Sequence, residues 1–159
     1  MSLSYRNRRG VTLIELLIVA SIAGAMIAIA LPTFANGLEN IRLSQASDGV
    51  ASFLNAALNR VERREQVLEI TISPRDNLIL FRSADASFSR KLSLPDGIVV
   101  DAVLPALPQD SGVTRRFLLL PGASAPRIGV QLANRRGQRR IVSLDPITGV
   151  PSIERPATP

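Results

Sequence analysis

The chain has no cysteine and no histidine among its 159 residues. It therefore lacks disulfides, thiolate nucleophiles, zinc sites of the Cys/His type and the commonest general base. Its aspartates lie beside expected turns or strands, with no convincing base paired to any of them, and we expect them to stabilise turns. We predict no enzymatic activity, no cofactor, no metal and no small-molecule substrate. The aspartates considered are Asp96, Asp101, Asp110 and Asp145.

Lysine and aromatic residues are also scarce, with one lysine, five phenylalanines and one tyrosine. The formal charge of +6 is therefore carried almost entirely by arginine. Three arginines precede Gly10, so removal of residues 1–10 would lower the charge to about +3, plus a new terminal amine. The net charge by itself is weak support for nucleic-acid binding.

One long apolar run is present, VTLIELLIVASIAGAMIAIAL over residues 11–31, with Glu15 as its single charge. At about 1.5 Å per residue it reaches roughly 30 Å, the thickness of a bilayer core. The arginines in the preceding segment keep the N-terminus cytoplasmic by the positive-inside rule and send the rest of the chain outward. The sequence predicts a single-pass transmembrane helix over 11–31.

A second helical pattern follows over residues 32–64, where apolar residues recur every three or four positions. Pro32 removes a backbone donor, which predicts a kink but not an end to the helix. We expect one long helix over 11–64, with local irregularity near Gly37 and Gly49. The expected apolar stripe is Phe34, Leu38, Ile41, Val50, Phe53, Leu54, Ala57, Leu58 and Val61.

After Arg64 the pattern changes to seven short β-type runs separated by turn signals. They predict a mostly antiparallel β-rich head over 65–154, whose apolar face the amphipathic helix would cover. The predicted fold class is α+β, with a long N-terminal helix packed on a mostly antiparallel β-sheet head. The stretch PSIERPATP is expected to fray, with 155–159 as a flexible tail. The seven runs are QVLEITIS, NLILFRS, FSRKLSL, GIVVDAV, TRRFLLL, RIGVQLA and RRIVSLD.

Glu15 is a functional candidate on physical grounds. A carboxylate near the middle of an apolar helix costs about 2.5 to 3.5 kcal/mol on insertion scales, so it requires a partner. If the chain is cut after Gly10, the new amine of Val11 lies one turn away, and a neighbouring subunit's amine is a second candidate.

Two other readings of the N-terminus remain. A secretory signal has a shorter apolar stretch, of about 7 to 15 residues, and the best small-residue cut here, Thr33-Phe34-Ala35, is poor. A plain membrane anchor on an unrelated periplasmic binding domain fits the length of the run but leaves Glu15 and Gly10 unexplained.

The string RRGVTLIELLIVASIAGAMIAIALP closely resembles the N-terminal signature of type IV prepilins and type II secretion pseudopilins. The resemblance implies that prepilin peptidase cuts between Gly10 and Val11, and that Val11 is N-methylated. It also implies that Glu15 guides assembly on an inner-membrane platform with other pilins or pseudopilins. Val11 departs from the pattern, because the family usually has phenylalanine there.

The C-terminal half is similar to the head of GspH/FimT-type minor pseudopilins. The resemblance implies a minor subunit of a type II secretion pseudopilus, with its helix in the bacterial inner membrane and its head in the periplasm. Neither the C-terminal cysteine pair of major type IV pilins nor the acidic calcium loop of major pseudopilins is present. The residues that carry the resemblance are Phe117, Pro121, Gly122, Gly137, Thr148 and Gly149.

The hairpin ANRRGQRR gives an alternative function. Arginines grip phosphates by charge and by bidentate hydrogen bonds, so a concentrated patch would suit a FimT-like minor type IV pilin that binds DNA for uptake. Arg115 and Arg116 would extend the patch. Against this, no aromatic residue is interleaved for base stacking. The hairpin arginines are Arg135, Arg136, Arg139 and Arg140.

Overall fold

The computed structural model describes residues 11–85, 87–107 and 112–156, with the backbone alone for 30–36. Contacts divide it into two compact units, Met1–Leu38 and Glu39–Pro159. The elements are α1 (Leu13–Arg64), β1 (Leu68–Ser73), β2 (Leu78–Ser83), β3 (Ser89–Ser93), β4 (Ile98–Leu104), β5 (Arg115–Leu119), β6 (Gly129–Asn134), β7 (Arg139–Leu144) and β8 (Pro151–Glu154).

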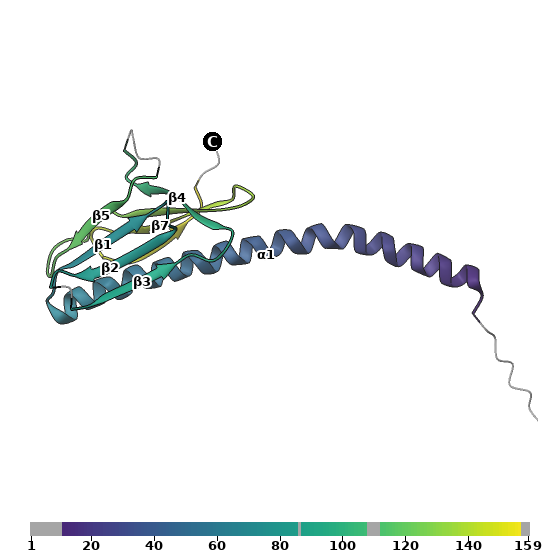
Figure 1. Cartoon of the computed structure of the whole chain (residues 1–159), viewed down its shortest axis with the longest axis horizontal. Helices are drawn as coiled ribbons and strands as arrows, with labels where there is room; N and C mark the ends of the chain where they lie inside the picture. Colours follow the sequence, from purple (N-terminus) through teal and green to yellow (C-terminus); the bar gives the residue numbers. More distant parts are fainter. Residues whose placement is uncertain (1–10, 86, 108–111, 157–159) are drawn as a thin grey trace, which may run out of the picture. The chain divides into compact units, whose positions relative to one another are not determined.

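Helix α1 is continuous from Leu13 to Arg64, close to the predicted bounds (Figure 1). The irregularity expected near Gly37 and Gly49 is not found. Close to Gly49, the buried hydroxyl of Ser47 donates to the carbonyl of Leu43 at 2.8 Å, so this polar side chain is satisfied within the helix. The helix ends before Glu65, whose left-handed φ of 50° breaks the helical backbone.

The buried face of α1 in the second unit differs in part from the predicted stripe. The prediction is right from Val50 to Val61 but wrong for Ile41, which is 54% exposed. Ile41 precedes the buried Leu43 by two positions, so at about 100° per residue it lies about 200° around the helix from it. Leu38, the last residue of the first unit, is 50% exposed, and the side chain of Phe34 lies outside the described residues. The buried positions are Leu43, Ala46, Ser47, Val50, Phe53, Leu54, Ala57 and Val61.

The head consists of two four-stranded sheets, ordered β3-β2-β1-β5 and β4-β6-β7-β8. Every pairing is antiparallel, and the seven predicted runs form β1 to β7. The eighth strand corrects the prediction that PSIERPATP frays, because Pro151–Glu154 pairs with β7. Proline is tolerated there because it is the first residue of an edge strand. The α+β pilin-like class is confirmed.

Both sheets share one core with the second half of α1. The rings of Phe53 on α1 and Phe81 on β2 lie 4.6 Å apart, and Leu132 and Val142 bring β6 and β7 into the same cluster. Each such side chain contributes about 1.5 to 3 kcal/mol when it leaves water. The helix and both sheets of the head are therefore held together by one shared core.

Candidate functional site

The start of α1 is a capped helix terminus. Thr12 precedes the first helical residue, and its Oγ1 accepts the N–H of Glu15 at 3.3 Å. Glu15 therefore lies in the first turn, where the helix dipole favours a carboxylate, and not near the middle of the helix as predicted from the sequence. The pattern Thr-x-x-Glu before an apolar run is typical of a helix start and could have predicted this position.

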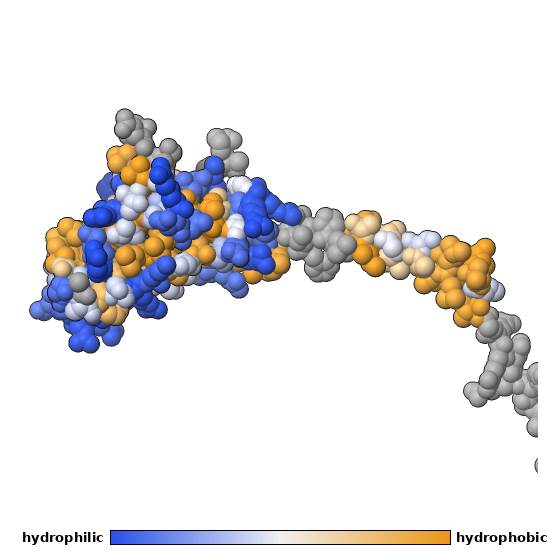
Figure 2. Space-filling model, in the orientation of Figure 1, coloured by the Kyte–Doolittle hydropathy of each residue, from blue (hydrophilic) through white to orange (hydrophobic). Residues whose placement is uncertain are grey.

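The side chains that follow are apolar on every side of the helix. In residues 11–29 the large ones are exposed by 54% to 81%, and Figure 2 shows this hydrophobic surface. A helix that is apolar all round is normally buried in a larger assembly or a membrane. The exposed residues are Val11, Leu13, Ile14, Leu16, Leu17, Ile18, Val19, Ile22, Met26, Ile27 and Ile29.

The polar groups of this segment are few. Ser21 donates to the carbonyl of Leu17 at 2.8 Å, so its hydroxyl is satisfied within the helix. Within the described part of the chain, no hydrogen bond or ion pair to the Glu15 carboxylate is present. The carboxylate is thus the one charge in residues 11–29 and lacks an intramolecular partner there.

The other N-terminal site residues are only partly described. Gly10 lies outside the described residues, and Val11 precedes α1 with its side chain exposed. Pro32 lies within α1, which continues through it, and the kink stays a prediction. In the residues that the structure describes, no helix has the length and apolarity needed to cross a membrane.

The turn between β6 and β7 is organised by Asn134, which is 5% exposed. Its Oδ1 accepts the N–H groups of Arg136 and Gln138, both at 3.0 Å, and its Nδ2 donates to Gln138 Oε1 at 2.8 Å. Gly137 closes the turn with a φ of 76°, a conformation that side chains rarely adopt. The turn therefore holds the adjacent arginines on a fixed backbone.

The four hairpin arginines have different partners. Arg139 pairs with Asp101 at 3.0 Å, whereas Arg140 donates to the hydroxyl of Ser44 at 3.1 Å. Successive strand residues point to opposite faces, which separates these two side chains. Arg135 lies against Gly97, and Arg136 is exposed.

The partners Asp101 and Ser44 were missed as parts of the hairpin site, because each is far away in sequence. Arg115 donates to the carbonyls of Val103 and Pro105, at 3.0 and 2.5 Å, and lies over the ring of Phe117. Its guanidinium is thus engaged on β4 and β5. Arg116 is exposed on β5.

One aspartate has the turn-stabilising role expected of it. Asp145 Oδ1 accepts the N–H groups of Ile147 and Thr148 at 2.7 and 2.9 Å. These donors, Thr148 foremost, hold the pKa of Asp145 below its ordinary value. Asp101 instead pairs with Arg139 from within β4, and Asp110 lies outside the described residues.

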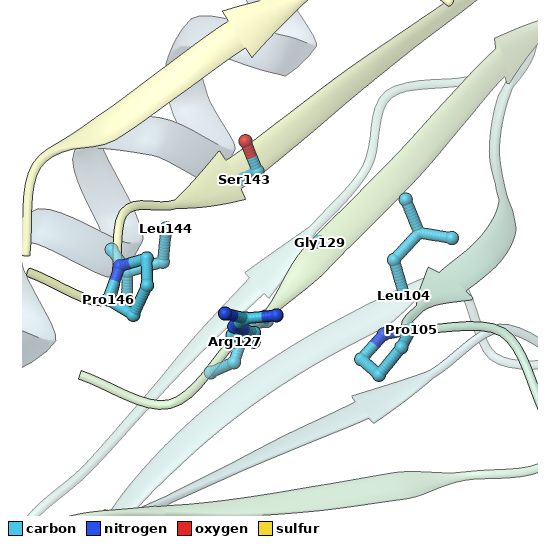
Figure 3. A pocket seen from close by; sticks show the side chains of 8 residues that line it. Leu104, Pro105, Arg127, Gly129, Ser143, Leu144 and Pro146 are labelled. Atoms are coloured by element: carbon cyan, nitrogen blue, oxygen red, sulfur yellow. The ribbon is translucent and has the colours of Figure 1, made fainter. Parts of the chain in front are cut away.

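The head has a shallow cavity of about 380 Å³ with an apolar lining. Figure 3 shows Arg127 between Pro105 and Pro146 at this cavity. Arg127 is its single charged lining residue, so the cavity has no acid–base pair. A second cavity, of about 320 Å³, lies beside Asn59, Glu62 and Ile147. In the part of the chain that is described, no cluster of carboxylates could hold a metal ion.

A comparison with protein families gives one match, to the prokaryotic N-terminal methylation motif over residues 5–31. No curated protein and no solved structure gives a match. The matched segment contains the capped helix start with Glu15 and most of the exposed apolar surface. It indicates a precursor of the type IV pilin-like or pseudopilin kind, in which a structural subunit is processed at its N-terminus.

Proposed function

We propose that this chain is a minor pseudopilin of a type II secretion pseudopilus. The leader 1–10 is removed by prepilin peptidase between Gly10 and Val11, and the new amine of Val11 is methylated. Residues 11–31 hold the subunit in the bacterial inner membrane, with the head in the periplasm, until the assembly platform adds it to the filament. Its role is structural, and other proteins supply the energy.

The observation that carries this proposal is the fully apolar half-helix that begins with a capped glutamate. Each large side chain from Leu13 to Ile29 that remains in water forgoes about 1.5 to 3 kcal/mol, so the segment needs a cover. Bundling with the same segment of other subunits supplies one. Inside such a bundle Glu15 would be poorly solvated, and a neighbouring subunit's Val11 amine is the counter-charge that suits it.

The assignment as a minor subunit is supported by three glycines of the head and by the absence of cysteine. Gly122, Gly137 and Gly149, which carry the GspH/FimT resemblance, have φ values of 67°, 76° and 68°. Side chains rarely adopt this conformation, so these turns favour glycine, which agrees with a specific head fold rather than chance composition. The absence of cysteine argues against a major type IV pilin.

A complementation experiment tests the proposal. A strain lacking this gene receives the wild-type chain, Glu15→Gln or Glu15→Asp, and Glu154→Gln serves as a matched control on the exposed head. We expect Glu15→Gln to be cut normally but to fail in restoring secretion, with partial rescue by Glu15→Asp. Full secretion with Glu15→Gln would overturn the proposal.

The second candidate is a DNA-binding minor type IV pilin. It is favoured by the exposed Arg135 and Arg136, which have no ion pair among the described residues. If the same deletion strain loses DNA uptake but still secretes normally, the DNA-binding pilin is favoured over the pseudopilin.

A further inference from the structure

The strand β5 forms an edge of its sheet, and the ladder shows which of its backbone groups face outward. The first β1–β2 pair is Leu68 with Ser83, so Val67 lies opposite Ala84. The N–H of Ala84 donates to the carbonyl of Val67 at 3.1 Å, which makes this a hydrogen-bonded pair. By alternation, odd-numbered residues of β1 bond to β2 and even-numbered ones bond to β5. Their β5 partners are odd-numbered, so Arg116 and Leu118 direct N–H and C=O away from the sheet.

The side chains on the same stretch make that edge partly apolar. Leu118 is 58% exposed and Leu120 49% exposed, on the face that also carries Arg116. No backbone partner of Arg116 or Leu118 beyond β1 is present in the described part of the chain. An open edge with outward leucines is a template for another strand.

The other three edge strands are each protected. On β4, the side chain of Asn77 bonds to the N–H of Val100 at 3.1 Å and to the carbonyl of Ile98 at 3.5 Å. A bulge after Val100 interrupts the same strand. Strand β3 exposes two basic residues, Arg90 and Lys91, and β8 is a four-residue strand that starts with proline. Strand β5 exposes one basic residue, Arg116, but its ladder has no bulge, and in the described part of the chain no group bonds to its outward backbone. It is therefore the most open edge of the described head.

We propose that β5 pairs antiparallel with β5 of a second copy of this chain, with Leu118 opposite the partner's Leu118. This contact is separate from the bundling of the N-terminal helices and does not depend on it. In each copy, β5 belongs to the sheet β3-β2-β1-β5, so the pairing would join these two sheets, one from each copy, into one eight-stranded sheet.

The side chains favour this register. Leu118 meets an identical apolar side chain, and Arg116 faces the partner's Leu120, against which its aliphatic stem can pack. The two Arg116 guanidiniums are then four residues apart along the strands, about 13 Å, which exceeds the Debye length of about 10 Å at moderate salt. No like charges stand directly opposite each other.

The chain has no cysteine, so a single introduced thiol reports on this pairing. Full-length Leu118→Cys in detergent is oxidised with copper phenanthroline and run on a non-reducing gel. A hydrogen-bonded antiparallel pair separates Cα atoms by about 5.5 Å, within disulfide range. We expect a dimer band, and none from Val99→Cys, an exposed thiol on the protected edge strand β4, at a position that is 43% exposed.

A charge swap in the Leu118→Cys chain tests the register. Leu120→Arg places a second cation against the partner's Arg116, and the dimer band should be lost. Adding Arg116→Glu to that variant creates two ion pairs and should restore it. A band of equal strength from Val99→Cys, a monomer with Leu118→Cys, or no recovery on the charge swap would overturn the proposal. Circular dichroism checks that each variant is folded.

Discussion

Arg139 on β7 and Asp101 on β4 form an ion pair, with Nε and Oδ2 3.0 Å apart, across the intervening strand β6. Gln131 of β6 donates to the same carboxylate oxygen at 2.6 Å. One of the four hairpin arginines is therefore neutralised by a residue that precedes the hairpin by more than thirty positions. Arg140 keeps its charge, because its partner Ser44 is a neutral hydroxyl. Arg135 and Arg136 also keep theirs, and both are exposed at the tip of the hairpin.

If the hairpin binds DNA, Asp101→Asn should strengthen binding, because Arg139 then becomes available to phosphate. Each added phosphate contact also steepens the salt dependence of binding by about one unit in a plot of log K against log salt. Arg135→Gln with Arg136→Gln should weaken binding and flatten that slope. Fluorescence anisotropy with a short duplex at several salt concentrations measures both.

Arg115→Gln is the matched control for the hairpin variants, since its guanidinium is engaged by the carbonyls of Val103 and Pro105. It removes one formal charge away from the hairpin, so it is compared with Arg136→Gln alone, which removes one charge at the tip. Equal losses from these two single variants would mean that binding follows net charge alone.

Replacing Gly10 with leucine should leave a full-length precursor, since the resemblance assigns the peptidase's requirement to this glycine. The wild-type chain should lose ten residues and migrate faster on a gel. Gly24→Ala is the control, because a Cβ there meets nothing within 4 Å and alanine favours the helix. Unchanged processing of the Gly10 variant would contradict the prepilin interpretation, as would a processing defect in the control.

The stability of the DPITG turn should depend on pH through Asp145. Its pKa is lowered in the folded chain by the N–H groups of Thr148 and Ile147, so its contribution is complete above about pH 4. That contribution is lost as pH falls through the folded-state pKa. Asp145→Ala should therefore unfold at a lower temperature than wild type near neutral pH, and the two should converge once the pH falls below the folded-state pKa of Asp145.

Thermal unfolding followed by circular dichroism measures this difference. Asp96→Ala, an exposed aspartate near another turn, is the control and should behave as wild type at both pH values. A constant gap between Asp145→Ala and wild type at all pH values would point to a packing defect instead.

Two glycine-to-alanine substitutions should change stability in opposite directions. A Cβ at Gly129 would lie 2.8 Å from the Cβ of Leu104, an atom close to the backbone, so Gly129→Ala should cost about 1 to 3 kcal/mol. At Gly49 in α1 a Cβ meets nothing within 4 Å, and Gly49→Ala should stabilise by about 0.5 to 1 kcal/mol. Denaturant unfolding gives both values, and equal signs would contradict the packing described for β4 and β6.

The long helix and most strands could be predicted because their signals are local. The expected span 11–64 differs from Leu13–Arg64 by only two residues at one end. The agreement is close because apolar residues recur with the helical period up to Arg64 and lose that period after it. The seven predicted runs became β1 to β7 for the same reason. The methylation motif over residues 5–31 is likewise a local pattern.

The partners of these elements were not predictable, because they depend on contacts between residues far apart in the chain. Sequence order did not indicate that β5 would pair with β1. It gave no sign that Arg140 would contact Ser44, and it placed Ile41 on the wrong face of α1.

The sequence by itself determined the helix, the strand-forming runs and the prepilin-like N-terminus, since each follows from residues within a few positions of one another. The tertiary structure alone decided the division into two sheets, the ion pair of Asp101 with Arg139 and the open edge of β5. Strand order and register follow from burying one shared core, and that burial couples all parts of the head at once.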